Sequence, residues 1–425
     1  MKPEHKLEDP RVEDEAQGGE PAAGTAPQPR PEAACVVSGL SKSFKGTSVL
    51  ADVSFDVGEG ESLVLLGASG SGKTTILRII AGLEQPDAGR VRLHGRDVTD
   101  APARERGVGV IFQSYALFPR MTVEQNVGYG LRIRGRPKQE IKESVDQLLA
   151  LVRLEEHRRK YPAQLSGGQQ QRVAIARTLA YQPEVLLFDE PFGALDAQTR
   201  VRLRGEIRSL LREIKVPAVF ITHDQEEALE LGDRIAVLHA GRLEQVGTPG
   251  EVYNQPETEY VATFLGAANL LLGVAHAGAI EIGSAVLPAR AELERFREGQ
   301  PVKLVFRPED VCLSDTGTLP AGCRRLSNGV IEEVRFVGAY ERLTLRLDLT
   351  AARQPAAGEP PLVGVSISAG GDRRIGLPVA VTRPKTEASA LPLAVGAHVA
   401  IGLTSFRVLA NFALATERAS KVVDA

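Results

Sequence analysis

The sequence predicts an α/β domain with a mostly parallel sheet, followed by a small antiparallel β-barrel domain. Between residues 35 and 264, short apolar blocks alternate with segments of helical period, which is typical of a parallel sheet covered by helices. Residues 265–425 instead contain short strand-like runs separated by Gly, Pro and charged turns, with loops or insertions expected at 349–364 and 383–394. A length of 425 residues also favours two or three domains over one.

The expected elements of the first domain follow in order along the chain. Residues 1–34 are rich in Pro, Glu, Gly and Ala and are expected to be a disordered tail. A helical subdomain is expected at about 114–180. Within it, one helix face carries Ile141, Val145, Leu148, Leu149 and Val152. The other expected elements are strands at 35–57, 62–67, 107–113, 184–189 and 218–224, helices at 73–83 and 198–214, and a hairpin over 233–247.

Composition excludes several classes of protein. Hydrophobic residues make up 43% and charged residues 25%, and the formal net charge of −3 shows no basic excess that would indicate nucleic-acid binding. The longest weak candidate for a membrane span, residues 267–280, is too short and is interrupted by Asn269 and His276. The acidic N-terminus has no apolar segment of the kind found in signal peptides.

The cysteines indicate no metal site. Cys35, Cys312 and Cys323 are widely spaced, odd in number and in no CxxC pattern. We interpret all three as structural or incidental thiols, which suits a reducing cytoplasm.

A glycine-rich loop over residues 67–75, "GASGSGKTT", predicts a nucleotide site. It fits G-x-x-x-x-G-K-[ST], follows a predicted strand and opens a predicted helix. Backbone N–H groups of such a loop surround phosphates, and the helix N-terminus favours negative charge. The expected ligands are Gly67, Ala68, Ser69, Gly70, Ser71, Gly72, Lys73, Thr74 and Thr75. Lys73 is expected to reach the β- and γ-phosphates of ATP, and the Thr74 hydroxyl to bind Mg²⁺.

The strand "VLLFDE" supplies the complementary carboxylates. It ends in Asp189, which is placed to hold Mg²⁺, and Glu190, which is placed to deprotonate an attacking water. An Asp-Glu pair at a strand end is ordinarily a solvated turn, but the upstream phosphate loop favours the catalytic interpretation.

A second glycine loop, "LSGGQ" at 165–169, completes a set of motifs that resembles the ATP-binding subunits of ABC transporters. Five more pieces match in order and spacing: "LSKSF", "IFQSYALFP", "GALD", "FITHD" and residues 114–160, which resemble the helical subdomain that faces the permease. The resemblance covers about residues 35–250 and implies a P-loop NTPase cassette. It implies that Phe44 stacks on adenine, that Gln113 helps bind Mg²⁺ and supports catalysis, and that His223 is the switch histidine. Asp196 is implied to contact nucleotide as part of the D-loop.

The same resemblance implies a function for the second loop. Ser166 can cap a helix that begins Gly167, Gly168 and Gln169, and the bare backbone allows an anion to approach closely. In the family this loop closes over the nucleotide of another subunit. Two copies of the chain would therefore sandwich two ATP molecules.

The segments 245–271 and 306–311 resemble a narrower group, importer ATPases with an OB-like C-terminal barrel of the TOBE type. That group serves polyamines, ferric iron, sulfate, phosphonates and sugars, and we favour spermidine and putrescine. ATPase subunits do not touch the solute. The resemblance implies permease subunits and an extracytoplasmic solute-binding protein as partners, and a place on the cytoplasmic face of the bacterial inner membrane.

Other functions are disfavoured by specific features. Ribosome-directed relatives carry two cassettes and chromosome-associated ones insert coiled coils, whereas this chain has one cassette and no heptads. A non-catalytic regulator is disfavoured by Glu190 and His223. The barrel lacks a basic stripe with interleaved aromatics, and the chain has no Trp, so no nucleic-acid partner is expected. Arg307, Glu309 and Asp310 are expected to form structural ion pairs.

Overall fold

The protein is described here by a computed structural model covering residues 30, 33–193, 195–349, 364–367, 373–376 and 378–410. Most of the tail predicted at 1–34 lies outside these residues. Its end, however, packs on the first domain: Ala33 and Ala34 are buried, and the Arg30 guanidinium lies 2.7 Å from a carboxylate oxygen of Asp56. The contacts of the first domain therefore begin before Cys35 in the described part of the chain.

A mostly parallel sheet forms the centre of the first domain, as predicted. Its strands are β3 (Ser62–Leu66), β6 (Val108–Ile111), β7 (Val185–Asp189), β8 (Ala218–Thr222), β9 (Arg234–His239) and β10 (Arg242–Gly247). Among the described residues their order is β10-β9-β3-β8-β7-β6, and only the β9–β10 hairpin is antiparallel. Strands β3 and β8 are buried along their whole length, which explains their unbroken apolar sequences.

A smaller antiparallel sheet packs beside this one. It contains β1 (Cys35–Phe44), β2 (Thr47–Val57), β4 (Ala88–Leu93) and β5 (Arg96–Asp97), in the order β2-β1-β4-β5. Its buried side chains, such as Val37 and Phe55, share one core with Leu63 of β3 and Ile76 of the first helix. The β1–β2 hairpin is thereby held against the end of β3, where the phosphate loop begins.

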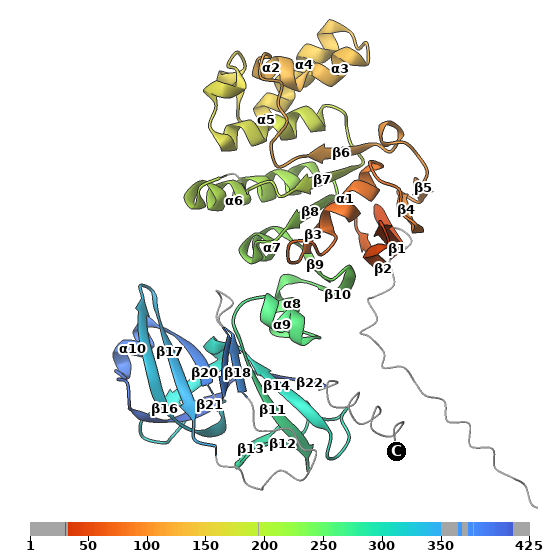
Figure 1. Cartoon of the computed structure of the whole chain (residues 1–425). Helices are drawn as coiled ribbons and strands as arrows, with labels where there is room; N and C mark the ends of the chain where they lie inside the picture. The colour runs from red at the N-terminus through yellow and green to blue at the C-terminus, as the bar shows by residue number, and fades with distance from the viewer. Residues whose placement is uncertain are drawn as a thin grey trace, which may run out of the picture.

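Helices cover the parallel sheet and form a separate layer at one end of the molecule (Figure 1). Those beside the sheet are α1 (Lys73–Ala81), α6 (Ala197–Ile214) and α7 (Gln225–Leu231). The helical layer contains α2 (Val123–Val127), α3 (Tyr129–Ile133), α4 (Lys138–Leu151) and α5 (Gly167–Leu179). The apolar face predicted for the helix at 138–151 is confirmed, because Val145 and Leu149 are buried against Val127 and Val173. Short 3-10 helices span Ala103–Glu105, Glu155–His157 and Pro162–Gln164.

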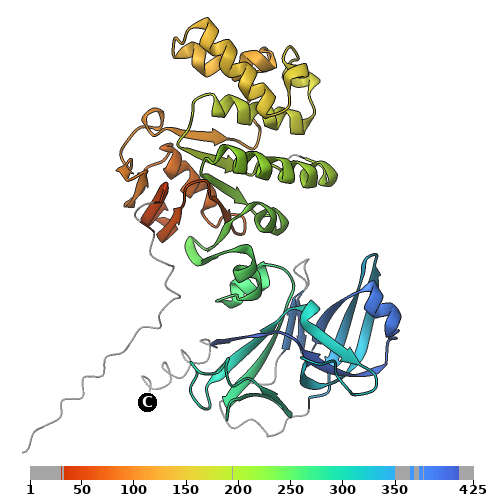
Figure 2. The ribbon, with the colours of Figure 1, turned by 180° about the vertical axis from the view of Figure 1, so that it is seen from behind.

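Two short helices, α8 (Pro249–Asn254) and α9 (Glu259–Phe264), lead from β10 into the C-terminal strands. Figure 1 and the view from behind in Figure 2 both show these helices, in green, between the cassette and the C-terminal strands. We call residues 248–267 the linker.

The C-terminal part is a curled antiparallel half-barrel, in agreement with the predicted barrel. Its first sheet holds β11 (Ala268–His276), β12 (Ala279–Ile282), β13 (Ala285–Pro288), β14 (Pro301–Phe306), β18 (Gly364–Ile367), β19 (Arg373–Gly376) and β22 (Arg407–Ala410). Its second holds β15 (Val311–Ser314), β16 (Arg324–Val337), β17 (Tyr340–Leu347), β20 (Pro378–Pro384) and β21 (His398–Leu403). Buried side chains of both sheets, including Leu304 and Ile401, form one core.

Two expectations for this region are wrong. The segment 383–394, expected to be a loop, contains the helix α10 (Lys385–Ala390). Cys312 and Cys323, interpreted as thiols, form a disulfide, and only Cys35 is a free cysteine among the described residues. The loop expected at 349–364 lies almost entirely outside the described residues. None of the helices in the described ranges is long and apolar enough to cross a membrane.

Candidate nucleotide site

The first glycine loop lies between β3 and α1 and has no room for side chains at two of its glycines. A Cβ at Gly67 would lie 2.3 Å from the carbonyl oxygen of Leu238, and one at Gly72 would lie 2.5 Å from Cδ2 of Leu50. Gly72, at the N-cap of α1, also has a φ of 103°, which favours glycine. No side chain caps α1, so its first N–H groups are available to an anion.

Lys73 is buried inside this loop. Its Nζ donates to the carbonyl oxygens of Gly67, at 2.7 Å, and Ala68, at 2.9 Å. Burial lowers the pKa of Lys73, while the negative charge of Glu190 opposes that shift. Ser71 is buried as well, whereas Ala68, Ser69, Gly70 and Thr74 are exposed and Thr75 is half-buried. The loop therefore presents backbone and hydroxyl groups around one buried ammonium.

The carboxylates predicted for catalysis stand at the carboxyl end of β7. Burial raises the pKa of Asp189, and the charge of Glu190 adds to that effect. Glu190 has a φ of 43°, an uncommon left-handed conformation for a residue with a side chain, which turns the chain sharply after the strand. Its Oε1 lies 3.2 Å from Nδ1 of His223, which follows β8 directly. The structure thus brings Glu190 and His223 together from neighbouring strands.

Gln113 and Phe44 lie at the margins of this group. Gln113 follows β6, and its Nε2 lies 3.1 Å from the Cβ position of Gly193 in the loop after Glu190. Phe44 ends β1 with 43% of its surface exposed, and Lys42 Nζ lies 5.1 Å from its ring centroid. Leu50 of the adjacent strand contacts Gly72, so the hairpin bearing Phe44 stands next to the phosphate loop.

The second glycine loop begins α5. The Ser166 hydroxyl accepts a hydrogen bond from Gln169 N–H, and the Gln169 side chain accepts one from Ser166 N–H, a capping box. A Cβ at Gly167 would lie 2.6 Å from Cδ2 of Leu195, so packing within the chain also favours glycine at this position. Among the described residues, no hydrogen bond or ion pair joins 67–75 to 166–169.

Asp196 begins α6 and caps it. Its carboxylate accepts a hydrogen bond from Thr199 N–H at 2.9 Å, and this bond lowers the pKa of Asp196. The carboxylate is therefore committed to its own helix and would be charged at neutral pH.

Comparisons with known proteins agree with this geometry. A family profile described as ABC transporter matches residues 50–193. The spermidine/putrescine import ATP-binding protein PotA of Oleidesulfovibrio alaskensis is 45% identical over 75% of this chain and 86% of its own. The chain belongs to the ATP-binding subunits of ABC importers. It is thus an ABC transporter ATPase, a translocase that binds ATP.

Other relatives carry a different solute in their names. The sulfate/thiosulfate import ATP-binding protein CysA of Halalkalibacterium halodurans is 52% identical over 73% of this chain and 86% of its own. The solved structure of cbiO1 from Clostridium perfringens, part of the ABC transporter complex cbiONQ, has a TM-score of 0.50 and 28% identity. It covers 52% of this chain and 90% of its own, so the likeness extends over about half of this importer ATPase.

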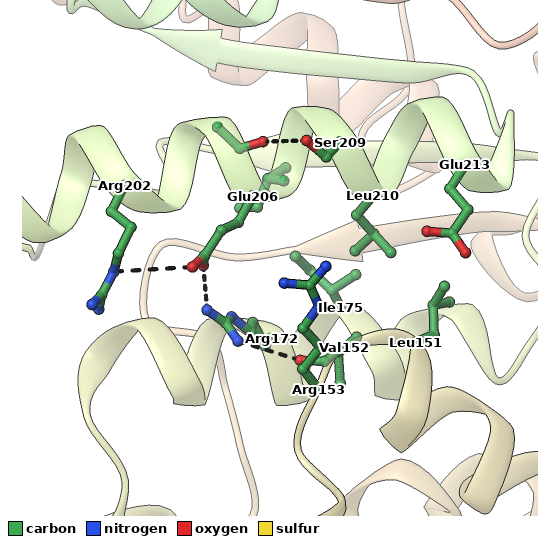
Figure 3. Close-up of a pocket in the computed structure, with 12 residues that line it drawn as sticks. Leu151, Val152, Arg153, Arg172, Ile175, Arg202, Glu206, Ser209, Leu210 and Glu213 are labelled. Atoms are coloured by element: carbon green, nitrogen blue, oxygen red, sulfur yellow. Dashed lines mark hydrogen bonds and ion pairs between the residues drawn. The ribbon is translucent and has the colours of Figure 1, made fainter.

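In this importer ATPase, helix α5, which begins with the second glycine loop, is joined to α6 by charged side chains. Arg172 of α5 bonds Glu206 of α6 and lies 3.5 Å from the carbonyl oxygen of Val152, and Arg202 lies 4.0 Å from Glu206 (Figure 3). These residues line a hollow of about 460 Å³ between α4, α5 and α6. Arg172, Arg202 and Glu206 also line a smaller hollow that reaches Ser166. The second glycine loop with α5 is therefore held against α6, the helix that Asp196 caps.

Several supporting residues were not predicted. Asn126 is completely buried and bonds the backbone of Phe118, Met121 and Thr122, which fixes the segment after Gln113. His157 Nε2 lies 2.7 Å from Nε2 of Gln169. An asparagine inside an apolar helical pattern is the one signal that could have indicated such a role.

Within the described part of the chain, the ion pairs expected at Arg307, Glu309 and Asp310 do not form. Arg307 donates to the backbone carbonyls of Tyr253, Ala262 and Ala267 instead. Glu309 accepts from the Tyr253 hydroxyl at 2.7 Å, which contributes with burial to raising the pKa of that tyrosine to about 12. The structural role is retained, but the partners are the linker backbone and a phenol.

Proposed function

We propose that this importer ATPase hydrolyses ATP, as a homodimer on the cytoplasmic face of the bacterial inner membrane, to power uptake of spermidine and putrescine. The observation that carries the hydrolytic role is the position of the Glu190 carboxylate, 3.2 Å from Nδ1 of His223. Glu190 is also close enough to Lys73 for its charge to oppose the lowering of the lysine pKa by burial. The polyamine assignment is supported by the printed name of one relative.

Nucleotide binding would use the first loop and the exposed aromatic. Phosphates would accept hydrogen bonds from the uncapped N–H groups of α1, and Lys73 would exchange its carbonyl partners for phosphate oxygens. Phe44, at 43% exposure, would stack its ring on adenine.

The residues present fit a Mg²⁺ ion. One carboxylate, one hydroxyl and one amide oxygen, from Asp189, Thr74 and Gln113, are the hard oxygen donors that Mg²⁺ accepts alongside phosphate and water. When bound, the ion would neutralise charge on the β- and γ-phosphates. Asp189 would hold it as a carboxylate.

Hydrolysis would begin with proton removal from water. Glu190 would accept that proton as the water oxygen forms a bond to the γ-phosphorus, and the bond between this phosphorus and the β–γ bridging oxygen breaks. ADP leaves with the electron pair of the broken bond. His223 would orient Glu190 and the γ-phosphate, and Ser166, Gly167, Gly168 and Gln169 would close over the partner copy's nucleotide together with Asp196. Preferential binding of ATP to the closed pair would drive closure.

Glu190→Gln tests the hydrolytic role. The amide cannot accept the proton, so turnover should fall about 10²–10⁴-fold while ATP binding persists. Glu184→Gln is the matched control, because Glu184 precedes the same strand but pairs with Arg96 on the surface. Near-normal phosphate release by the Glu190 variant refutes the role.

The transported solute has a second candidate. The 52% identity to a sulfate/thiosulfate importer subunit favours an oxyanion, whereas the PotA relative favours a polyamine. Uptake of labelled spermidine and of labelled sulfate in a strain lacking this gene separates them. We expect loss of spermidine uptake with sulfate uptake retained; the opposite pattern transfers the assignment to sulfate. Ferric iron, phosphonate and sugars are tested in the same strain. The permease and solute-binding partners would be identified from the same uptake system.

A further inference from the structure

The first residue of α7 joins the nucleotide site to the linker. Gln225 stands two positions after His223, and its side-chain Nε2 donates to the carbonyl oxygen of Phe264. Its Oε1 accepts the Gly266 N–H at 2.9 Å. One side chain therefore satisfies a donor and an acceptor of the linker, at the point where α9 ends and β11 is about to begin.

The C-terminal domain also binds this stretch of backbone. Arg307, 5% exposed, donates to Ala262 at 2.7 Å and to Ala267 at 3.0 Å. Its guanidinium also lies over the Tyr253 ring, 4.2 Å from the centroid. The backbone of residues 262–267 is thus bonded by one side chain from the cassette and by one from the half-barrel.

The contacts around Gln225 extend to the reacting groups. Asp224 caps α7 through the N–H groups of Glu226 and Glu227, and it pairs with Arg200 at 3.1 Å. Arg200 also donates to the Leu195 carbonyl, in the loop that follows Glu190. His223, next to Asp224, reaches Glu190 at 3.2 Å. The first turn of α7 is therefore fixed by hydrogen bonds on both sides, and its position sets that of His223.

The linker also packs on β9, the strand beside the phosphate loop. The Tyr260 ring stacks on His239 with centroids 3.7 Å apart and on Phe264 at 5.2 Å. The carbonyl oxygen of Leu238, the residue before His239, lies 2.3 Å from the position of a Cβ at Gly67. The segment held by Gln225 is thus connected to the phosphate loop through the end of β9.

We infer that Gln225 is a positioning residue that couples the C-terminal half-barrel to His223 through the linker backbone at Phe264 and Gly266. This inference rests on the role proposed for His223. It gives the half-barrel a way to alter turnover without touching the nucleotide, and it gives nucleotide binding a way to alter the linker.

The test compares Gln225→Ala with Gln245→Ala in the full-length protein. Gln245 is a close match: its side chain donates to the Gln255 carbonyl at 3.1 Å and accepts from Glu257 N–H at 3.0 Å. It thus holds the same linker with two hydrogen bonds but is not adjacent to His223. Gln225→Met, which keeps the length without the amide, separates loss of hydrogen bonds from loss of volume.

We expect Gln225→Ala and Gln225→Met to lower kcat about threefold to tenfold with KM for ATP changed less than about twofold. Hydrogen exchange over residues 262–268 should depend on a non-hydrolysable ATP analogue in the wild type and in Gln245→Ala. It should be fast with or without the analogue in the Gln225 variants. An unchanged kcat, or an equal loss of this dependence in Gln245→Ala, overturns the inference.

The two proposals fail separately. The exchange measurement needs nucleotide binding only, whereas normal turnover in His223→Ala would refute the role of that histidine. If His223→Ala is fully active while the Gln225 variants still uncouple the linker, the proposed mechanism is wrong at His223. The linker connection then remains supported.

Discussion

Cys35 shows how strongly burial can change the acidity of one side chain. It begins β1 with no exposed surface, and burial, aided by the charge of Asp56, raises the pKa of its thiol to about 12. A thiol held neutral in this way is unreactive, because the thiolate is the nucleophile.

We therefore expect Cys35 to resist alkylation by iodoacetamide in the native protein up to pH 10 and to react quickly once the protein is unfolded. The pKa of Cys35 in the folded protein lies above the ordinary value of 9.0. The contribution of the neutral thiol to the free energy of unfolding is therefore complete below pH 9 and is lost as pH rises toward 12. Cys35→Ala should lack this alkaline loss in denaturant titrations. Labelling of native protein at pH 8 contradicts the prediction.

Among single residues, those of the motifs could be predicted from the sequence, whereas the residues that hold the site and the linker in place could not. Lys73, Asp189 and Glu190 belong to local patterns that phosphate binding imposes, so the sequence places them directly. Gln225 bonds a carbonyl 39 positions away, and such a pairing leaves no periodic or spacing signal. Arg307 was expected beside carboxylates but binds backbone carbonyls, since a basic residue in sequence does not reveal its acceptor.

Among the elements, the disulfide was missed for a topological reason. Strands β15 and β16 lie on opposite sides of β21, and both Cys312 and Arg325 are in register with Gly402. The bond between Cys312 and Cys323 therefore passes over β21 where there is no side chain; a Cβ at Gly402 would lie 3.4 Å from that of Cys323. Sequence separation alone could not indicate that a strand from residue 398 onward comes between them.

Cys312→Ser should lower the free energy of unfolding of the half-barrel by about 2–3 kcal/mol under oxidising conditions, because the bond closes a short loop in the unfolded chain. The measurement is denaturant unfolding with and without dithiothreitol. Reductant should lower the free energy of unfolding of the wild type to that of the variant and leave that of the variant unchanged. Equal stability of the two proteins without reductant would show that the bond contributes nothing.

Helix α5 corrects part of the reasoning about the second glycine loop. Its bare backbone was expected to allow close approach to the nucleotide of another subunit. Gly167 also accommodates Leu195 of its own chain, so one of the two glycines is explained by local packing. Gly168, whose Cβ position has no neighbour closer than 3.6 Å, has no such in-chain reason.

For the whole molecule, the two loops have no hydrogen bond or ion pair between them within the described residues, which fits a site completed by a second copy. Ser166→Arg should block ATP-driven dimerisation while leaving ATP binding at Lys73 intact, because the larger cation would occupy the face that meets the partner's nucleotide. Ser209→Arg, on an exposed part of α6, is the control. Sedimentation of the Glu190→Gln background with ATP measures the dimer. A Ser166 variant that still dimerises defeats the composite site.

Lys73 has a consequence for the affinity of the whole protein. Its ammonium already holds two carbonyl oxygens of the loop, so ATP must compete for it rather than simply add a partner. The net free energy that Lys73 contributes to ATP binding is then the difference between its hydrogen bonds to charged phosphate oxygens and those to neutral carbonyl oxygens. Discrimination against uncharged molecules follows from the same exchange, because a ligand without anionic oxygens offers the ammonium nothing better than what the loop supplies.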